Sequence, residues 1–340
     1  MGKNSPGEMN RAARASFPPG DRQLLVKNLR IDHDRSREAL TAIKRFHFPV
    51  IGGVADTGGV SVLAGDSRTG KSFAAKAYCD QFPHSTGPDG MLFPVVYSDM
   101  PPNGGYRAIL ENLADAKQLI HTRRMNNAVL LNNVLRSMRY HQVELIVLDE
   151  FQDVFDPDKP RLVIEARRLL RKILNLGTLN IICVGLLDTY ELMTRDEQLT
   201  GRGGLPYKIL RPYEWGSEEE RALFRLLCDE IDSALPFNQK SGLGTVAIAQ
   251  RLFFVTYGII GRLKDFLFAA ACIAINDEAD RIESHHLATA YEERKPRNTT
   301  FNPFLHDMSL APKPKAPPRP SFPSDPFSKT RRPKSDEALI

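Results

Sequence analysis

Apolar residues gather in short continuous runs along the first two thirds of the chain, and amphipathic segments separate these runs. The runs are 60–64 (VSVLA), 93–98 (FPVVYS), 144–150 (ELIVLDE) and 180–185 (NIICVG). Apolar character on both faces is typical of buried parallel strands. The segments 34–46, 106–120, 126–140 and 161–176 show helical periodicity. Strands that alternate with helices predict an α/β fold with a doubly wound parallel sheet.

The pattern changes after residue 215, where helical segments follow one another with no strand between them. These segments are 217–231, 245–257, 262–276 and 284–293. They predict a separate small all-α domain, 216–295, after an α/β domain, 31–215. Residues 1–30 are polar and predict a flexible arm. Residues 296–340 are rich in proline and basic residues and predict a disordered tail.

Composition narrows the class of protein without identifying a partner. The hydrophobic content of 42% and charged content of 26% are typical of a soluble globular protein. No apolar run is long enough to span a membrane, and the N-terminus lacks the apolar core of a secretory signal. The four cysteines lack metal-ligand spacing, which favours free thiols in a reducing cytoplasm. A net charge of +5 permits a nucleic-acid partner but does not require one.

The clearest chemical motif lies between the first strand and the helix that follows it. GDSRTGKS matches the phosphate-loop pattern G-x-x-x-x-G-K-[ST]. The candidate nucleotide-binding residues are Gly65, Asp66, Ser67, Arg68, Thr69, Gly70, Lys71, Ser72 and Phe73. The glycines permit a tight turn whose N–H groups face phosphate, and the helix N-terminus adds its positive dipole end. Lys71 is expected to contact the β/γ-phosphates and Ser72 to ligate Mg²⁺.

A second candidate site element ends the third strand. Asp149, at the carboxyl end of this strand, is suited to holding Mg²⁺ together with Ser72. Glu150 is suited to orienting and deprotonating the attacking water. The acid pair and the lysine loop together favour ATP hydrolysis over simple nucleotide binding. A GTPase is disfavoured because the chain lacks an Asn-Lys-x-Asp guanine-reading tetrapeptide.

These motifs, with RDEQL at 195–199 and YGIIGRL at 257–263, resemble the AAA+ ATPases of the TniB/TnsC family, regulators of DNA transposition in bacteria. The resemblance spans about residues 62–267. It implies a P-loop AAA+ fold with a five-stranded parallel sheet and a helical lid. It also implies ATP- and Mg²⁺-dependent homo-oligomers, as rings or filaments, on double-stranded DNA, which cooperate with a transposase and a target-selection protein in the cytoplasm.

The resemblance also assigns roles to arginines outside the phosphate loop. Arg262 matches a sensor-2 arginine that contacts the γ-phosphate of its own subunit, although a surface ion pair is the alternative. Arg202, in a glycine-rich loop, or Arg195 would be the arginine finger offered to a neighbouring subunit, and Arg202 is preferred. Leu186 departs from the family pattern, since a polar sensor-1 residue is expected there. Either Asp188 or Thr189 substitutes for it, or hydrolysis is slow.

Candidate DNA contacts come from cations and hydroxyls after the second strand: Arg107, Thr122, Arg123 and Arg124. Such groups neutralise or hydrogen-bond phosphates, but a solvated helix cap is the alternative. Without a helix-turn-helix or zinc signature, binding would depend on the DNA backbone and shape. Two other functions stay open: an ATP-switched protein scaffold that does not engage DNA, and a helicase loader.

Overall fold

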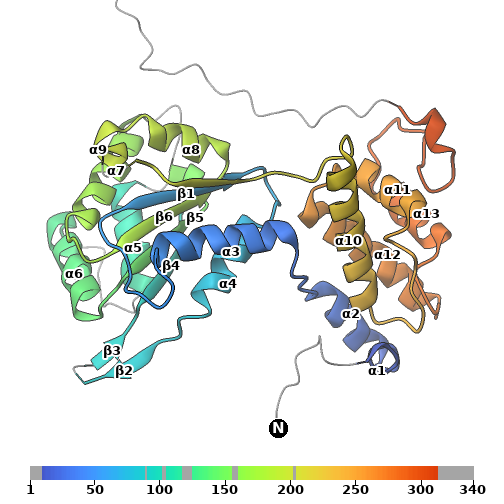
Figure 1. Cartoon of the computed structure of the whole chain (residues 1–340), viewed down its shortest axis with the longest axis horizontal. Helices are drawn as coiled ribbons and strands as arrows, with labels where there is room; N and C mark the ends of the chain where they lie inside the picture. Colours follow the sequence, from blue (N-terminus) through green and yellow to red (C-terminus); the bar gives the residue numbers. More distant parts are fainter. Residues whose placement is uncertain are drawn as a thin grey trace, which may run out of the picture.

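The computed structural model describes residues 10–88, 90–101, 105–116, 125–154, 160–201 and 204–312. Figure 1 shows an α/β domain beside an all-helical domain. Thr122, Arg123, Arg124 and Arg202 lie outside the described residues, as does the tail beyond residue 312. Arg195, which is exposed at the end of a helix, is the described candidate for the arginine finger.

The α/β domain is built on a five-stranded sheet in which every pairing is parallel, as predicted. Its order is β4-β5-β6-β1-β7. The strands are β1 (Val60–Gly65), β4 (Val95–Asp99), β5 (Leu145–Asp149), β6 (Asn180–Gly185) and β7 (Tyr207–Leu210). The carboxyl ends of β1, β5 and β6 therefore lie side by side, and this places the phosphate loop next to the acid pair.

Side chains on successive strand residues enter two different cores, which explains the continuous apolar runs. In β5, Leu145 and Val147 pack against one helical layer, while Ile146 and Leu148 pack against the other. The first layer consists of α3 (Asp34–His47) and α4 (Lys71–Cys79). The second contains α5 (Tyr106–Ala116), α6 (Asn127–Tyr140), α7 (Pro160–Leu174) and α8 (Leu187–Thr194).

Smaller elements connect these layers. The antiparallel hairpin β2 (Ser85–Gly87) and β3 (Gly90–Leu92) follows α4, and its strands are too short for periodicity to reveal them. The 3-10 helix η1 (Phe151–Val154) directly follows β5, and the short helix α9 (Glu197–Thr200) follows α8. The position of η1 matters for the site, because it begins one residue after Glu150.

The helical domain contains the four helices that the sequence predicts. They are α10 (Glu218–Ala234), α11 (Val246–Thr256), α12 (Ile260–Asn276) and α13 (Ser284–Glu292). Their apolar faces form one core that also takes in Tyr213 and Trp215 from the connection to the sheet. The domain is thus joined to the α/β domain by packing as well as by the chain.

The predicted flexible arm is wrong from residue 10 onward, because the chain folds there into α1 (Arg11–Ala15) and α2 (Pro19–Lys27). Val26 is 3% exposed within the core of the helical domain. Arg11, Arg14 and Arg22 donate to backbone carbonyls at or just beyond the end of α10. Carbonyls at the end of a helix lack the regular intrahelical partners, so the arginines cap it. The polar sequence hid this long-range role.

The predicted tail likewise begins too early. Asn302 is fully buried, and its amide donates to the Ala288 carbonyl at 3.1 Å and to Glu292 at 2.8 Å. Phe304 stacks on Phe266 of α12 with ring centroids 5.5 Å apart. The helical domain therefore includes residues up to about the 3-10 helix η2 (Met308–Leu310). Short polar stretches around single aromatic residues concealed this packing.

A buried histidine at the end of α3 makes fold stability depend on pH. His47 is fully buried, and its Nδ1 shares a 2.9 Å hydrogen bond with the Tyr78 hydroxyl. Burial lowers the pKa of His47 to about 4. The Glu144 carboxylate lies 3.5 Å from Nε2 and would favour the charged ring, but the loss of hydration prevails.

We expect the protein to lose stability as pH falls from about 6.5 to about 4. An unfolded histidine with a pKa near 6.5 binds a proton that the folded site resists, so the stabilisation is complete above that range. The loss approaches about 3 kcal/mol once the pH is below both values. Chemical unfolding measured across this range checks it. His47→Gln should flatten the dependence, whereas the exposed His84→Gln should not.

Candidate nucleotide-binding site

The phosphate loop occupies the turn between β1 and α4, as the motif predicts. Gly70 adopts a φ of 95° and caps the helix, a conformation that side chains rarely allow. Helix α4 then begins at Lys71, and its first N–H groups are directed back toward the loop. The Thr69 hydroxyl donates to the Asp66 carbonyl at 2.8 Å and braces the turn. The loop thus presents a preformed anion site.

Lys71 is held inside this loop. It is 7% exposed, and its Nζ donates to the carbonyls of Gly65 at 3.0 Å and Asp66 at 2.7 Å. Burial lowers the pKa of Lys71, while the charges of Glu150, Asp149 and Asp66 oppose that shift. The ammonium therefore lies within electrostatic reach of the acid pair and has only carbonyl partners, which a phosphate can replace.

Asp149 is 1% exposed at the end of β5 and is held from two sides. The Tyr97 hydroxyl donates to its Oδ2, and the Glu150 N–H donates to its Oδ1 at 2.8 Å. Burial, together with the contact with Asp149, raises the pKa of Tyr97, so the hydroxyl stays protonated and remains a donor. A carboxylate oxygen has more than one acceptor position, so both oxygens retain capacity for a cation.

A pocket of about 430 Å³ opens in front of the loop and is closed by both domains. One half is charged and contains Lys71, Ser72 and Glu150. The other half is apolar, and its lining residues come from α2, the segment after it, α10 and α12: Val26, Leu29, Ile31, Leu227, Ile231, Leu235 and Leu267. A pocket with one anion-binding and one apolar part suits a nucleotide, with phosphates on the loop and the base against the aliphatic side chains.

The lid cation that reaches the pocket is Lys264 rather than Arg262. Lys264 lines the pocket, and burial together with Arg30 lowers its pKa despite the opposing charge of Asp265. Arg262 is exposed, lies outside the lining and places its guanidinium 5.6 Å from the Tyr257 ring centroid. The structure therefore does not bring the predicted sensor residue to the loop.

The lid also contacts the loop through its backbone. The Gly261 N–H donates to the Arg68 carbonyl at 2.9 Å, and a Cβ at Gly261 would lie 2.8 Å from the Cβ of Arg68. The Arg68 guanidinium pairs with the Asp265 carboxylate on the same helix. A movement of the loop on phosphate binding would therefore change the contacts between Arg68 and α12 and move the helix.

We expect Lys264→Ala to weaken ATP binding about tenfold or more, and Arg262→Ala to change it less than twofold. Both side chains are exposed, but only Lys264 lines the pocket, where loss of a charge-assisted contact to phosphate costs about 1.5–3 kcal/mol, whereas loss of a surface cation outside the pocket costs little. Titration with a fluorescent ATP analogue measures both. Equal effects of the two substitutions, or a larger effect at Arg262, would return the sensor role to Arg262.

The end of β6 contributes backbone rather than a polar side chain. Leu186 lines the pocket, and its N–H donates to Oε1 of Gln152 at 3.0 Å. Thr189, a predicted substitute, is fully buried. Asp188, the other, lies outside the pocket lining. The sequence analysis did not identify Gln152 as a residue of the site. Its position two residues after Glu150 could have suggested that it contacts this carboxylate.

The described candidate for DNA contact has another role. Arg107 donates to Glu111 at 2.8 Å, to the Met125 carbonyl and to Asn127 at 3.0 Å. It thereby ties α5 to the start of α6 and is partly buried. The structure thus assigns Arg107 to bracing the segment whose other predicted contacts lie outside the described residues.

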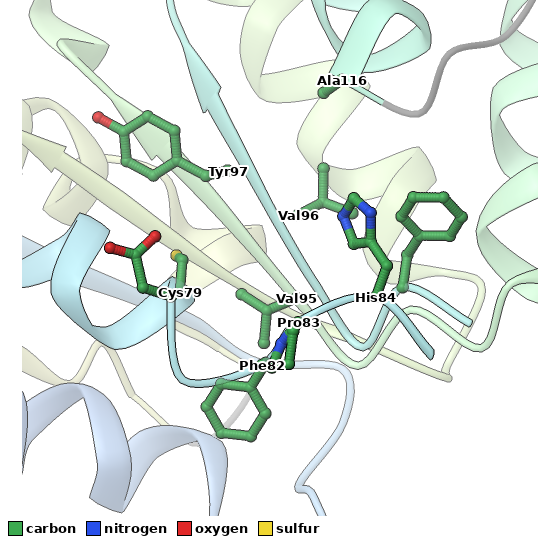
Figure 2. A pocket seen from close by; sticks show the side chains of 10 residues that line it. Cys79, Phe82, Pro83, His84, Val95, Val96, Tyr97 and Ala116 are labelled. Carbon is green, nitrogen blue, oxygen red and sulfur yellow. The ribbon is translucent and has the colours of Figure 1, made fainter. Parts of the chain in front are cut away.

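A second cavity of about 470 Å³ lies beside the edge strand β4 (Figure 2). Figure 2 shows Cys79, His84 and Tyr97 around it. Its lining contains no lysine or arginine, so it does not suit a phosphate. Burial raises the pKa of Cys79 to about 12, so this thiol is not a nucleophile near neutral pH.

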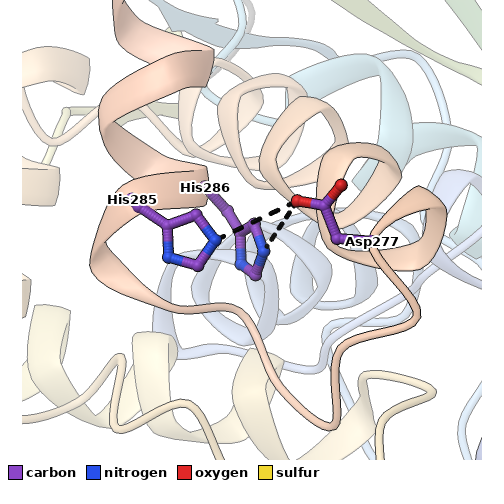
Figure 3. A group of neighbouring side chains, drawn as sticks. All are labelled: Asp277, His285 and His286. Atoms are coloured by element: carbon purple, nitrogen blue, oxygen red, sulfur yellow. Dashed lines mark ion pairs between the residues drawn. The ribbon is translucent and has the colours of Figure 1, made fainter.

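Asp277, His285 and His286 form a cluster at the start of α13 (Figure 3). The Glu283 N–H donates to Nδ1 of His286 at 2.9 Å, which requires a lone pair on that nitrogen. A neutral ring then carries its proton on Nε2, which faces Asp277 at 3.3 Å. A metal on Nε2 would move the ring proton to Nδ1, and Nδ1 could then no longer accept the hydrogen bond from the Glu283 N–H that caps the helix. We therefore interpret the cluster as structural.

The fold and the loop define an AAA+ P-loop protein. One similar structure is Cdc6p of Pyrobaculum aerophilum, with 16% sequence identity and a TM-score of 0.57 over 80% of this chain and 70% of that one. A second is the Aeropyrum pernix ORC2 protein in its ADPNP–ADP complexes, with 15% identity and a TM-score of 0.58 over 80% of this chain and 71% of that one. A third is the Aeropyrum pernix ORC1 protein in complex with DNA, with 15% identity and a TM-score of 0.58 over 80% of this chain and 69% of that one. At these identities the similarity shows the fold alone.

Within that class, residues 55–204 match the family described as bacterial TniB protein. The matched segment runs from just before β1 to just before β7 and holds the loop, the acid pair and the end of β6. This segment is thus similar to TniB proteins, as the motifs within it predicted. No curated protein sequence matches it. Within the described residues, no helix is long and apolar enough to cross a membrane.

Proposed function

We propose that this protein is an ATP-dependent regulator of DNA transposition, which assembles on double-stranded DNA with ATP and Mg²⁺ and recruits or activates a transposase. One observation carries the proposal: in a chain whose residues 55–204 match the TniB family, the phosphate loop shares its pocket with Glu150 and is hydrogen-bonded to the lid. Nucleotide in this pocket would contact both domains, so their relative position would depend on its presence.

Different residues of the pocket would bind the phosphates and activate water. Lys71 exchanges its carbonyl partners for phosphate oxygens, and Lys264 adds charge from the lid. Glu150, which faces the same pocket, orients and deprotonates water. An arginine from a neighbouring subunit, Arg202 or Arg195, would complete the site in an oligomer. ATP would thereby be shared between subunits, so its hydrolysis would loosen their contact.

The oxygen donors near the loop fit Mg²⁺. Ser72 supplies a hydroxyl that lines the pocket, and Asp149 supplies a carboxylate held in place by Tyr97 and the Glu150 N–H. Magnesium prefers oxygen ligands of this kind and is usually bound by few protein groups together with phosphates. When bound, the ion would neutralise charge on the phosphates, while Ser72 and Asp149 hold it.

Duplex DNA is the proposed assembly template. The resemblance to the TniB/TnsC regulators of DNA transposition supports this choice, and so does the Aeropyrum pernix ORC1 protein, a structural neighbour described in complex with DNA. Thr122, Arg123 and Arg124 stay the proposed phosphate contacts. A transposase and a target-selection protein are the proposed partners, because the resemblance to the TniB/TnsC family implies them.

The test is cosedimentation of the full chain with duplex DNA at several salt concentrations, with ATP, a non-hydrolysable ATP analogue or no nucleotide. We expect nucleotide-dependent pelleting and a log-log salt slope steeper than about −3, because several phosphates would be contacted in each assembly unit. Assembly without DNA dependence would favour the ATP-switched scaffold. Selective binding of a replicative helicase, with no effect on a transposase, would favour the helicase loader.

A further inference from the structure

The Gln152 side chain connects two parts of the site that the backbone leaves separate. It stands in η1, two residues after Glu150, and is half-buried. Its Nε2 donates to Oε2 of Glu150 at 2.6 Å. Its Oε1 accepts from the Leu186 N–H at 3.0 Å. One carboxamide therefore joins the acidic end of β5 to the end of β6.

The fold leaves little freedom at this bridge. A Cβ at Gly185 would lie 2.6 Å from Oε1 of Gln152 and 2.3 Å from Oγ1 of Thr189. A glycine is therefore needed for the end of β6 to approach the carboxamide this closely. The Leu186 N–H thus donates to Gln152. Leu186 also lines the pocket, but its side chain contributes no polar group there.

Glu150 depends on this contact for its orientation. Its side chain is exposed and its backbone has a φ of 51°, a conformation uncommon for a residue with a side chain. Packing therefore does little to fix the carboxylate, and a short hydrogen bond from an amide does so instead. The bond leaves the other carboxylate oxygen, Oε1, available to accept a proton from water.

We propose that Gln152 is the positioning residue for Glu150 and fixes its carboxylate against the end of β6. It acts through Glu150 and touches neither nucleotide nor water in this role. The inference rests on the proposed ATPase function and deepens it. It predicts that hydrolysis, rather than ATP affinity, depends on the carboxamide, because the bridge holds the base and not the phosphates.

The experiment compares steady-state ATP hydrolysis and ATP-analogue affinity in the full chain and its variants. Gln152→Ala should lower kcat about tenfold and leave the dissociation constant within twofold. Gln152→Glu keeps the size of the side chain but removes the N–H that donates to Glu150, so it should lower kcat by a similar factor and also leave the dissociation constant within twofold. Gln81→Ala, an exposed glutamine at the end of α4, is the matched control and should change neither.

The outcomes separate this inference from the function on which it rests. If the unmodified chain hydrolyses ATP and either Gln152→Ala or Gln152→Glu keeps its kcat, the positioning role is overturned. If ATP affinity falls with kcat in both variants, Gln152 supports the fold of the pocket instead. If the unmodified chain neither binds nor hydrolyses ATP, the proposed function fails, and the inference fails with it.

Discussion

Replacing Lys71 by alanine is expected to lower ATP affinity by at least about a hundredfold and to abolish nucleotide-dependent assembly on duplex DNA. The buried ammonium is the cation at the centre of the loop, and it loses only two carbonyl contacts when it turns to phosphate. Charge-assisted contacts in a desolvated site exceed ordinary hydrogen bonds, and loss of one here leaves the phosphate charge poorly compensated. Calorimetric titration measures the affinity, and sedimentation measures the assembly.

Lys44→Ala is the matched control, because it removes the same charge from an exposed position on α3. It should leave affinity and assembly unchanged. Thermal unfolding without nucleotide shows whether Lys71→Ala remains folded. A folded Lys71→Ala variant that still assembles with ATP would remove the loop from the mechanism.

The sheet could be predicted from the sequence because its central strands are buried on both faces. Continuous runs such as 144–150 leave few alternatives to a strand, and β5 and β6 fall within one residue of their predicted bounds. β7 has four residues with an exposed tyrosine at its start, so its pattern is much weaker. The five-stranded sheet followed from the family resemblance rather than from this run.

The N-terminal segment folds through long-range contacts that its local sequence pattern does not predict. Its arginines act through carbonyls more than two hundred residues away, at the end of α10. Leu29 and Ile31, on the segment that follows, line the nucleotide pocket. Whether a polar segment folds depends here on partners that only the tertiary structure supplies, so the sequence could not place the arm at the site.

Some residues of the site could likewise be predicted from the sequence, and others only from the tertiary structure. The loop and acid pair lie where their spacing predicts, since both follow parallel strands that end at one edge. The lid cation could not be chosen from spacing, because residues 262 and 264 differ by about 200° around α12 and only the docking of the helix decides which faces the pocket. The role of Gln152 depends on the neighbouring strand β6, which is distant in sequence.

Glu150→Gln is expected to reduce ATP hydrolysis by about 10²–10⁴-fold and to leave ATP affinity nearly unchanged. The amide keeps the shape of the side chain but cannot accept a proton from water. Glu150 lines the pocket beside Leu186 without a direct hydrogen bond to the phosphate loop, so binding does not need its charge. Phosphate release measures turnover, and the lifetime of DNA-bound assemblies after ATP removal should increase.

Glu165→Gln on α7 makes the same chemical change on an exposed surface outside the pocket and is the control. It should leave turnover and assembly lifetime as they are in the unmodified chain. The combination of long-lived assemblies and slow hydrolysis is the decisive result, because it would show that ATP binding builds the assembly and that hydrolysis ends it. Rapid disassembly of the Glu150→Gln variant would separate assembly from the hydrolytic cycle and leave nucleotide binding alone as the switch.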